Sequence, residues 1–169
     1  MTPTLTVAEL NALPEQAART RLAGCCASRA WADAVVQDRP YPTREALLSA
    51  AAAACAQLSP ADLDEALAAH PRIGERATGD GDAARLSRHE QSAVTRADSA
   101  VREELRAANA AYEERFDRVF LVRAAGRGPE EILAELRRRL GNGPDAERAE
   151  VARELAEITR IRIEGLVTA

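Results

Sequence analysis

The sequence predicts an all-α protein that folds as one compact domain over residues 1–169, with about eight helices. Alanine, the residue with the highest helix propensity, occupies 38 of the 169 positions. Aromatic residues make up only 3% of the chain, which argues against a β-sandwich or barrel built on aromatic strands. Signals that start and stop helices recur along the whole chain, and its length suits a single hydrophobic core.

The first part of the chain carries signals for five helices. Thr6 and Glu9 form a capping-box pattern, in which each side chain bonds the backbone N–H of the other residue. Pro60 follows a serine N-cap, and Pro71 prevents that helix from continuing past His70. The expected bounds are 6–13, 15–24, 28–39, 43–58 and 59–70.

The second part opens with a glycine- and aspartate-rich loop over residues 74–82. The apolar run 119–125 is either a strand or an irregular buried segment, because periodicity alone does not separate the two for so short a run. Helical periodicity and capping residues predict further helices over 84–97, 101–116, 129–140 and from residue 144 to the end.

Bulk properties exclude several classes of protein. The net charge of −4 argues against a nucleic-acid partner, because nucleic-acid binders usually carry a basic excess. The longest apolar run, 50–56, is far shorter than the roughly 18 residues that span a membrane. The first residues lack a basic segment followed by an apolar one, so we expect no secretory signal. Three cysteines, two of them adjacent, form no disulfide framework, which suits the cytoplasm. With two histidines and no zinc motif, we expect no metal site of that kind.

The last helix places one arginine on its apolar side. At 100° per residue, Arg162 lies in the middle of the apolar stripe, whereas Arg160 lies on the polar side, spaced for an i,i+4 pair with Glu164. The stripe consists of Val151, Leu155, Ile158 and Leu166, and the polar side also offers an Arg153–Glu157 pair. Arg162 therefore either extends along the edge of the core or binds a buried anionic partner.

Two more polar residues lie on apolar faces. Glu90 falls on the side of Leu86, Ala93 and Ala97, where a carboxylate needs a partner, and a structural ion pair is the alternative to a functional site. His70 continues the apolar face of the helix that it ends, where a histidine is more often a core residue than a catalytic one. Because every basic residue is arginine, lysine chemistry is excluded. An imidazole, a carboxylate and a guanidinium together suggest acid–base chemistry on a small anion.

Three motifs, in this order and spacing, resemble one known family. They are residues 69–75 (AHPRIGE), 87–91 (SRHEQ) and 120–124 (FLVRA), and the family is 2-oxo-4-hydroxy-4-carboxy-5-ureidoimidazoline (OHCU) decarboxylase, of uric acid degradation. Supporting matches are Cys25, Cys26, Trp31, residues 39–41, Asn109, Tyr112, Phe116 and residues 131–133, 139–142 and 158–162. The likeness covers nearly the whole chain.

The resemblance implies a cofactor-free, homodimeric lyase that converts the small molecule OHCU to (S)-allantoin and carbon dioxide in a pocket between helices. His70 and Glu90 are implied as the catalytic pair. The residues implied to bind substrate are Pro71, Ser87, Arg88, His89, Glu90, Gln91, Phe120, Leu121, Val122, Arg123, Ala124 and Arg162. Arg123 departs from the family, which often has cysteine or a small residue there, and we expect its side chain to point away from the pocket.

Two other functions fit the same residues. One is a lyase or isomerase acting on a related ureido or imidazoline acid, which Arg123 would favour by altering the pocket wall. The other is a non-catalytic helical interaction module, in which His70, Glu90 and Arg162 form a buried polar cluster that confers specificity. A substrate panel separates the first from OHCU decarboxylation, and loss of activity on substituting His70 separates the second.

Overall fold

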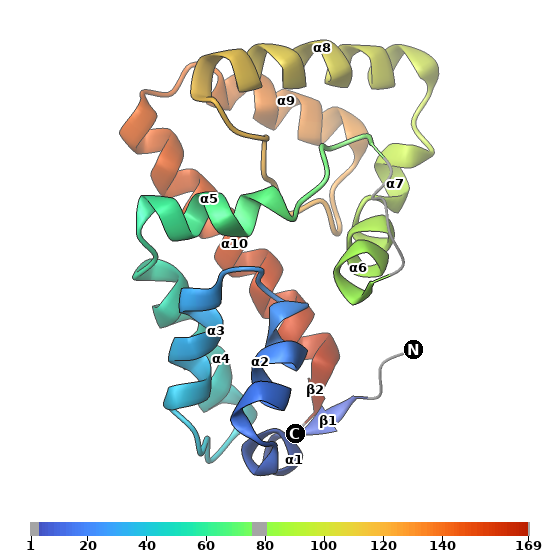
Figure 1. Cartoon of the computed structure of the whole chain (residues 1–169). Helices are drawn as coiled ribbons and strands as arrows, with labels where there is room; N and C mark the ends of the chain where they lie inside the picture. Colours follow the sequence, from blue (N-terminus) through green and yellow to red (C-terminus); the bar gives the residue numbers. More distant parts are fainter. Residues whose placement is uncertain (1–3, 76–80, 169) are drawn as a thin grey trace. The chain divides into compact units, whose positions relative to one another are not determined.

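The computed structural model describes residues 4–75 and 81–168, except for the side chains of residues 82 and 83. Ten helices and two short strands cover this part of the chain (Figure 1). In order they are β1 Leu5–Thr6, α1 Val7–Ala12, α2 Glu15–Ala23, α3 Arg29–Gln37, α4 Arg44–Ala56, α5 Pro60–Ala68, α6 Asp82–Glu90, α7 Ser92–Thr95, α8 Ser99–Phe116, α9 Pro129–Arg139, α10 Pro144–Leu166 and β2 Val167–Thr168. The prediction of an all-α fold is confirmed.

The chain divides into two compact units. The first contains residues 1–66 and 155–169, and the second contains residues 67–154. The single domain predicted over residues 1–169 stays a prediction.

The N-terminal unit is built from β1, α1 to α4, most of α5, the last part of α10 and β2. Local signals start its helices as expected: the Thr6 and Glu9 capping box forms, and the Ser28 side chain caps α3 by accepting from the Trp31 N–H. The Trp31 side chain is fully buried and donates from Nε1 to the Ala51 carbonyl oxygen at 3.0 Å, which joins α3 to α4. The parallel pairing of β1 with β2, Leu5 beside Val167, was not predicted, because it joins opposite ends of the sequence.

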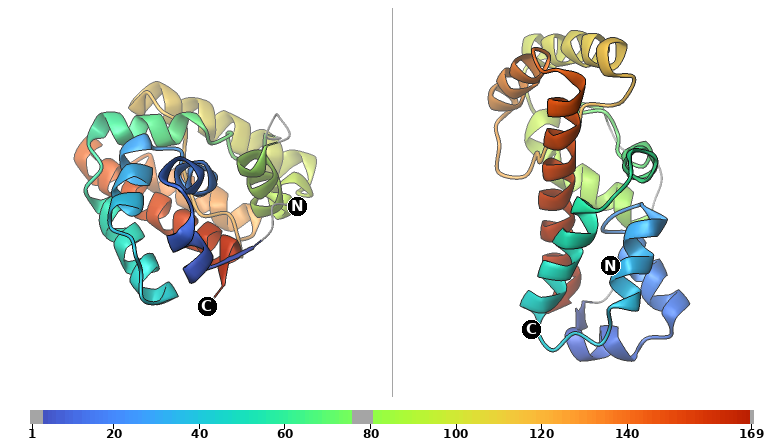
Figure 2. Two further views of the ribbon diagram at one scale, coloured as in Figure 1. Left: turned by 60° about the horizontal axis from the view of Figure 1, so that its bottom comes forward. Right: turned by 90° about the vertical axis from the view of Figure 1, so that its left-hand side faces the viewer.

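The second unit packs α8 along α9, and both views in Figure 2 show the two helices side by side. Its core contains apolar residues from these helices, from α7, from the loop after α5 and from the run that follows α8. They are Ile73, Val94, Leu105, Tyr112, Phe120, Val122, Ala124, Ile132, Leu133 and Leu136. The run 119–124 is neither helix nor strand, which decides between the two alternatives left open by the sequence.

Two predicted helices differ from the structure. The helix expected over 84–97 is interrupted at Gln91, which separates α6 from α7, and the helix expected to reach His70 ends at Ala68. His70 precedes Pro71, and the residue before a proline is disfavoured in helical geometry, so the helix ends earlier than the proline itself requires.

Within the described residues, no single helix is long and apolar enough to cross a membrane. Only α4 and α5 taken together have the length and apolar composition of a membrane-spanning segment. The two helices are bent by 112° where they meet.

Candidate functional site

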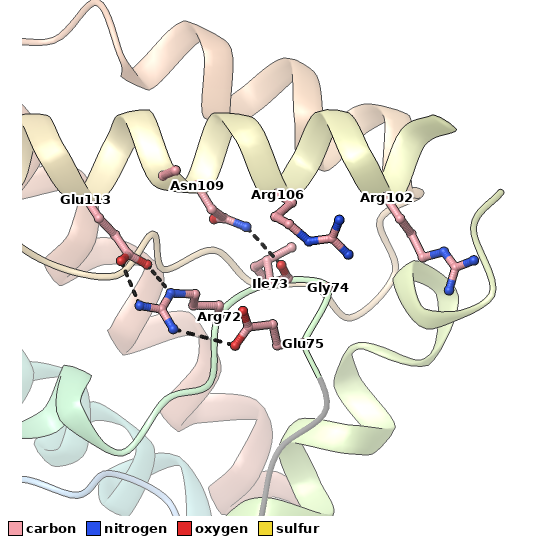
Figure 3. Close-up of a pocket in the computed structure, with 9 residues that line it drawn as sticks. Arg72, Ile73, Gly74, Glu75, Arg102, Arg106, Asn109 and Glu113 are labelled. Atoms are coloured by element: carbon pink, nitrogen blue, oxygen red, sulfur yellow. Dashed lines mark hydrogen bonds and ion pairs between the residues drawn. The ribbon is translucent and has the colours of Figure 1, made fainter. Parts of the chain in front are cut away.

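His70 and Pro71 begin a loop that two buried amide side chains hold in place. The Asn109 Nδ2 group on α8 donates to the Ile73 carbonyl oxygen at 2.9 Å, as Figure 3 shows. The Gly74 N–H donates to Gln91 Oε1 at 3.1 Å. Asn109 and Gln91 are both buried residues, and the Asn109 bond is shielded from water, so the two bonds fix the loop that follows His70.

The same loop is fastened to α8 by an ion pair on its outer side. The Arg72 guanidinium donates to both carboxylate oxygens of Glu113, with 2.9 Å between Nη2 and Oε2, and it lies 3.6 Å from Glu75 (Figure 3). Hydrogen bonding to Glu113 raises the pKa of Arg72 above its usual value. Because the Arg72 side chain is 47% exposed, we expect this pair to fix geometry more than to add stability.

A cavity of about 300 Å³ lies between this loop and α8. Its lining residues are Arg72, Ile73, Gly74, Glu75, Arg102, Arg106, Asn109, Ala110 and Glu113, most of which are labelled in Figure 3. None of the predicted catalytic or substrate-binding residues lines this cavity.

The second motif, residues 87–91, spans the end of α6 and its junction with α7. Ser87 and Gln91 are buried, 3% and 7% exposed, whereas Arg88 and Glu90 are half-buried and His89 is exposed. The predicted stripe of Glu90 with Ala93 and Ala97 was wrong, since Ala93 is exposed. The break at Gln91 changes the helical register, so the buried positions on this stretch become Ser87, Gln91 and Val94.

The third motif, residues 120–124, crosses the core of the second unit as an irregular segment. Phe120, Leu121, Val122 and Ala124 are buried. Side chains from the helices hold its backbone. Arg139 donates to the Leu121 carbonyl oxygen at 2.7 Å, and Glu154 accepts from the Arg123 N–H at 2.6 Å.

The Arg123 side chain folds back onto its own chain. Its Nη1 atom donates to the Ala125 carbonyl oxygen at 2.9 Å, next to Gly126, whose φ of +80° makes the turn. One end of the Arg123 guanidinium is therefore hydrogen-bonded within its own loop. The expectation that Arg123 points away from the substrate pocket stays a prediction.

Arg162 belongs to the N-terminal unit, on α10, and is 5% exposed. Arg160 is exposed and pairs with Glu164 at 3.1 Å, so the helical wheel assigned both arginines correctly. Arg153, expected to pair with Glu157, pairs with Glu150 at 3.4 Å.

Arg162 lies near the adjacent buried thiols of Cys25 and Cys26. Burial raises the pKa of the Cys25 thiol to about 12, and the positive charge of Arg162 opposes this rise. Hydrogen bonding to Cys55 lowers the pKa of Cys26. Burial and the high pKa make Cys25 a poor nucleophile at neutral pH.

Sequence reasoning missed the residues that support these motifs. Asn109 and Arg139 were noticed only as matches to a family, and Glu147 and Glu154 were not singled out. The sequence does contain a signal for Arg139: on a helical wheel it continues the apolar face that includes Leu136, and the structure shows that both residues are buried.

The part of the chain that the structure describes contains no group of three or more His, Cys, Asp or Glu side chains arranged to hold a metal ion.

Comparison with known proteins identifies the family. The family model described as OHCU decarboxylase matches residues 11–164. The chain belongs to the OHCU decarboxylase family. The match includes all three motifs and parts of both units.

Individual relatives agree with this assignment. The chain is 30% identical over 138 residues to a 2-oxo-4-hydroxy-4-carboxy-5-ureidoimidazoline decarboxylase from Amia calva, covering 80% of this chain and 79% of that protein. It is 33% identical over 145 residues to the uric acid degradation bifunctional protein TTL from Arabidopsis thaliana, covering 84% of this chain. The match spans only 45% of the length of the Arabidopsis protein.

Solved structures of the OHCU decarboxylase fold are also similar. A crystal structure of OHCU decarboxylase in the presence of (S)-allantoin matches with a TM-score of 0.75 and 25% identity, covering 91% of this chain and 98% of that one. A crystal structure of (S)-allantoin synthase matches with a TM-score of 0.74 and 21% identity, which is evidence for the shared fold alone, over 96% of this chain and 54% of that one.

Proposed function

We propose that this protein decarboxylates OHCU to (S)-allantoin and carbon dioxide, as a carboxy-lyase of uric acid degradation. The observation that carries the proposal is the family match over residues 11–164, which includes His70, Glu90 and the segment 120–124. The hydrogen bond between Gln91 and Gly74 supports it, because it links the first motif directly to the second.

The chemistry of the substrate explains why so few catalytic groups suffice. The OHCU carboxylate is attached to a carbon beside a carbonyl, so the electrons released with carbon dioxide pass into that carbonyl. The substrate therefore carries its own electron sink, and the proposed reaction requires no cofactor. The protein must orient the ring, stabilise the developing oxyanion and deliver one proton to one face.

His70 is our candidate for the proton donor. A histidine changes protonation state near neutral pH, and the fixed loop after His70 restricts where its imidazole lies. Delivery of the proton to one face accounts for a single product enantiomer.

Glu90 is the second proposed catalytic residue, and we propose that it holds the hydroxyl, ring N–H or ureido N–H groups of the substrate. The other proposed contacts are Pro71, Ser87, Arg88, His89, Gln91, Phe120, Leu121, Val122, Arg123, Ala124 and Arg162. Arg162 raises the rate only if it favours the transition state over the bound substrate, so we assign it to orienting the carboxylate or an oxygen that gains charge.

The remaining expectations belong to the same proposal. We propose a single family domain, supported by a match that includes parts of both units. We also propose a cytoplasmic homodimer with a small-molecule substrate and no nucleic-acid or membrane partner.

The experiment supplies freshly generated OHCU and follows the circular dichroism of the allantoin formed. Because OHCU decays without enzyme, the handedness of the product is the decisive measurement. The wild-type protein is expected to give (S)-allantoin, and the variants His70→Ala and Glu90→Ala are expected to give racemic product with the helical spectrum intact. A folded His70→Ala variant with full activity and selectivity would rule out the proposed mechanism, and comparison with His89→Ala tests which imidazole acts.

A further inference from the structure

Arg139, the last residue of α9, is completely buried and makes three kinds of contact. Its Nε atom donates to Glu147 Oε1 at 2.9 Å, and Nη2 donates to the same oxygen at 2.5 Å. Its Nη1 atom donates to the Leu121 carbonyl oxygen at 2.7 Å. The guanidinium also lies over the Phe120 ring, 4.6 Å from its centre. One side chain therefore grips two successive residues of the segment 120–124.

Glu147 aligns Arg139 and also accepts hydrogen bonds from two other side chains. Besides Arg139, its carboxylate accepts from the Tyr112 hydroxyl and, at 2.8 Å, from Asn142 Nδ2. Burial and the bond to Glu147 raise the pKa of the Tyr112 hydroxyl, which remains a proton donor at neutral pH. The guanidinium orientation is thus set by a network of four side chains, all within the second unit.

A gain in folding stability does not by itself explain the buried Arg139–Glu147 pair. Burying an ion pair carries a large desolvation cost, and well-packed apolar residues of similar size are often as stabilising or more so. An apolar replacement cannot supply the donor that Arg139 gives to the Leu121 carbonyl oxygen. Only an arginine at this position can contact Glu147, the Leu121 carbonyl oxygen and the Phe120 ring at the same time.

A second side chain holds the same segment from α10. Glu154 accepts from the Arg123 N–H at 2.6 Å and lies 3.5 Å from the Arg127 guanidinium. The segment therefore has backbone anchors at residues 121 and 123, supplied by helix side chains where a strand would have a neighbouring strand.

We propose that Arg139, aligned by Glu147, is a positioning residue that holds segment 120–124 in the shape that binds substrate. The inference rests on the proposed function, in which this segment lines the substrate pocket. Arg139 acts through the segment and has no part in the chemical step. Removing it leaves the helices intact and loosens the segment.

The test uses the variant Arg139→Met with Glu147→Gln, which removes both charges at similar volume and leaves an acceptor for Tyr112. Amide hydrogen exchange in residues 119–125 is expected to speed up at least about tenfold, while protection of α8 and α9 stays at the wild-type level. The kcat/KM for OHCU is expected to fall by about 100-fold, with less (S)-selective product, because small misplacements of binding groups are costly. Arg137→Met, an exposed arginine on the same helix that pairs with Glu104, is the matched control and is expected to behave as wild type.

Wild-type exchange in residues 119–125 would overturn the inference, as would a lower melting temperature with unchanged kcat/KM and selectivity in the folded fraction. If the double variant does not fold, Arg139→Lys decides, because an ammonium keeps the charge but lacks the planar fork that spans Glu147 and Leu121. Faster exchange with lower kcat/KM in that variant supports the inference, and wild-type values overturn it. If the wild-type protein itself does not convert OHCU, the proposed function fails, while the exchange measurement still tests the positioning of the segment.

Discussion

Gln91 Oε1 accepts a hydrogen bond from the backbone N–H of Gly74 at 3.1 Å. Gln91 lies where α6 gives way to α7, and Gly74 lies in the loop that begins with His70. The bond is partly buried and joins residues 17 positions apart, so it couples the helix break to the conformation of the loop. Two motifs that are separate in the sequence become one structural unit at this point.

Replacing Gln91 tests that coupling. Gln91→Leu removes the acceptor and leaves the Gly74 N–H without it, at an expected cost of about 1–3 kcal/mol in the free energy of unfolding. Gln91→Glu keeps an oxygen in place and is expected to recover most of that stability. Urea unfolding of the two variants measures the difference, and equal stability of Gln91→Leu and wild type would contradict the importance of the bond.

Gly74 is required by the backbone of the loop. Its φ is +87°, and a Cβ added there would meet only Val94 Cγ1, at an ordinary 3.8 Å. Gly74→Ala is therefore expected to cost about 1–2 kcal/mol through backbone strain, without a steric clash. Gly165→Ala is the control, since it lies in α10 with open space around it, and it is expected to stabilise the protein by about 0.5 kcal/mol. Thermal unfolding should move in opposite directions for the two variants, and a shared direction would refute the strain argument.

Arg162 and Arg160 form a matched pair on one helix. Arg162→Met keeps the length of a buried side chain but removes its charge, and kcat/KM for OHCU is expected to fall by about 100-fold if the guanidinium orients the substrate. Arg160→Met breaks only an exposed pair with Glu164 and is expected to change stability by less than about 0.5 kcal/mol, with no change in kcat/KM. Equal kcat/KM for the two variants would remove Arg162 from the proposed site.

Glu150 gives a prediction for pH. Hydrogen bonds from Arg138 and Asn142 lower the pKa of its carboxyl from 4.5 to about 2. Because the folded state favours the charged carboxylate, Glu150 adds to the free energy of unfolding. This stabilisation is complete above pH 4.5 and is lost as the pH falls toward 2. Glu150→Gln is expected to cost about 1 kcal/mol at pH 7, and this cost should shrink between pH 4.5 and 2. Denaturant unfolding across that range measures it, and a difference that does not change with pH would contradict the assignment.

Local signals predicted most of the helices well. The Thr6–Glu9 box and the Ser28 cap form as expected, because a cap involves only neighbouring residues. The helical wheel was right for Arg162 and wrong for Ala93 for one reason: α10 is continuous, whereas the break at Gln91 precedes Ala93. A wheel applied across an unseen break assigns the wrong face to every residue beyond it.

The sequence by itself determined the helical class, the inward position of Arg162 and, through three ordered motifs, the family. These depend on local propensity, on the 3.6-residue repeat and on residue identity at fixed spacing. Tertiary structure alone decided the irregular course of residues 119–124, the buried Arg139–Glu147 pair and the hold of Gln91 on Gly74. Each of these depends on a partner outside the residue's own helix or loop, and the free energy of burying a polar group is set by whether such a partner is present.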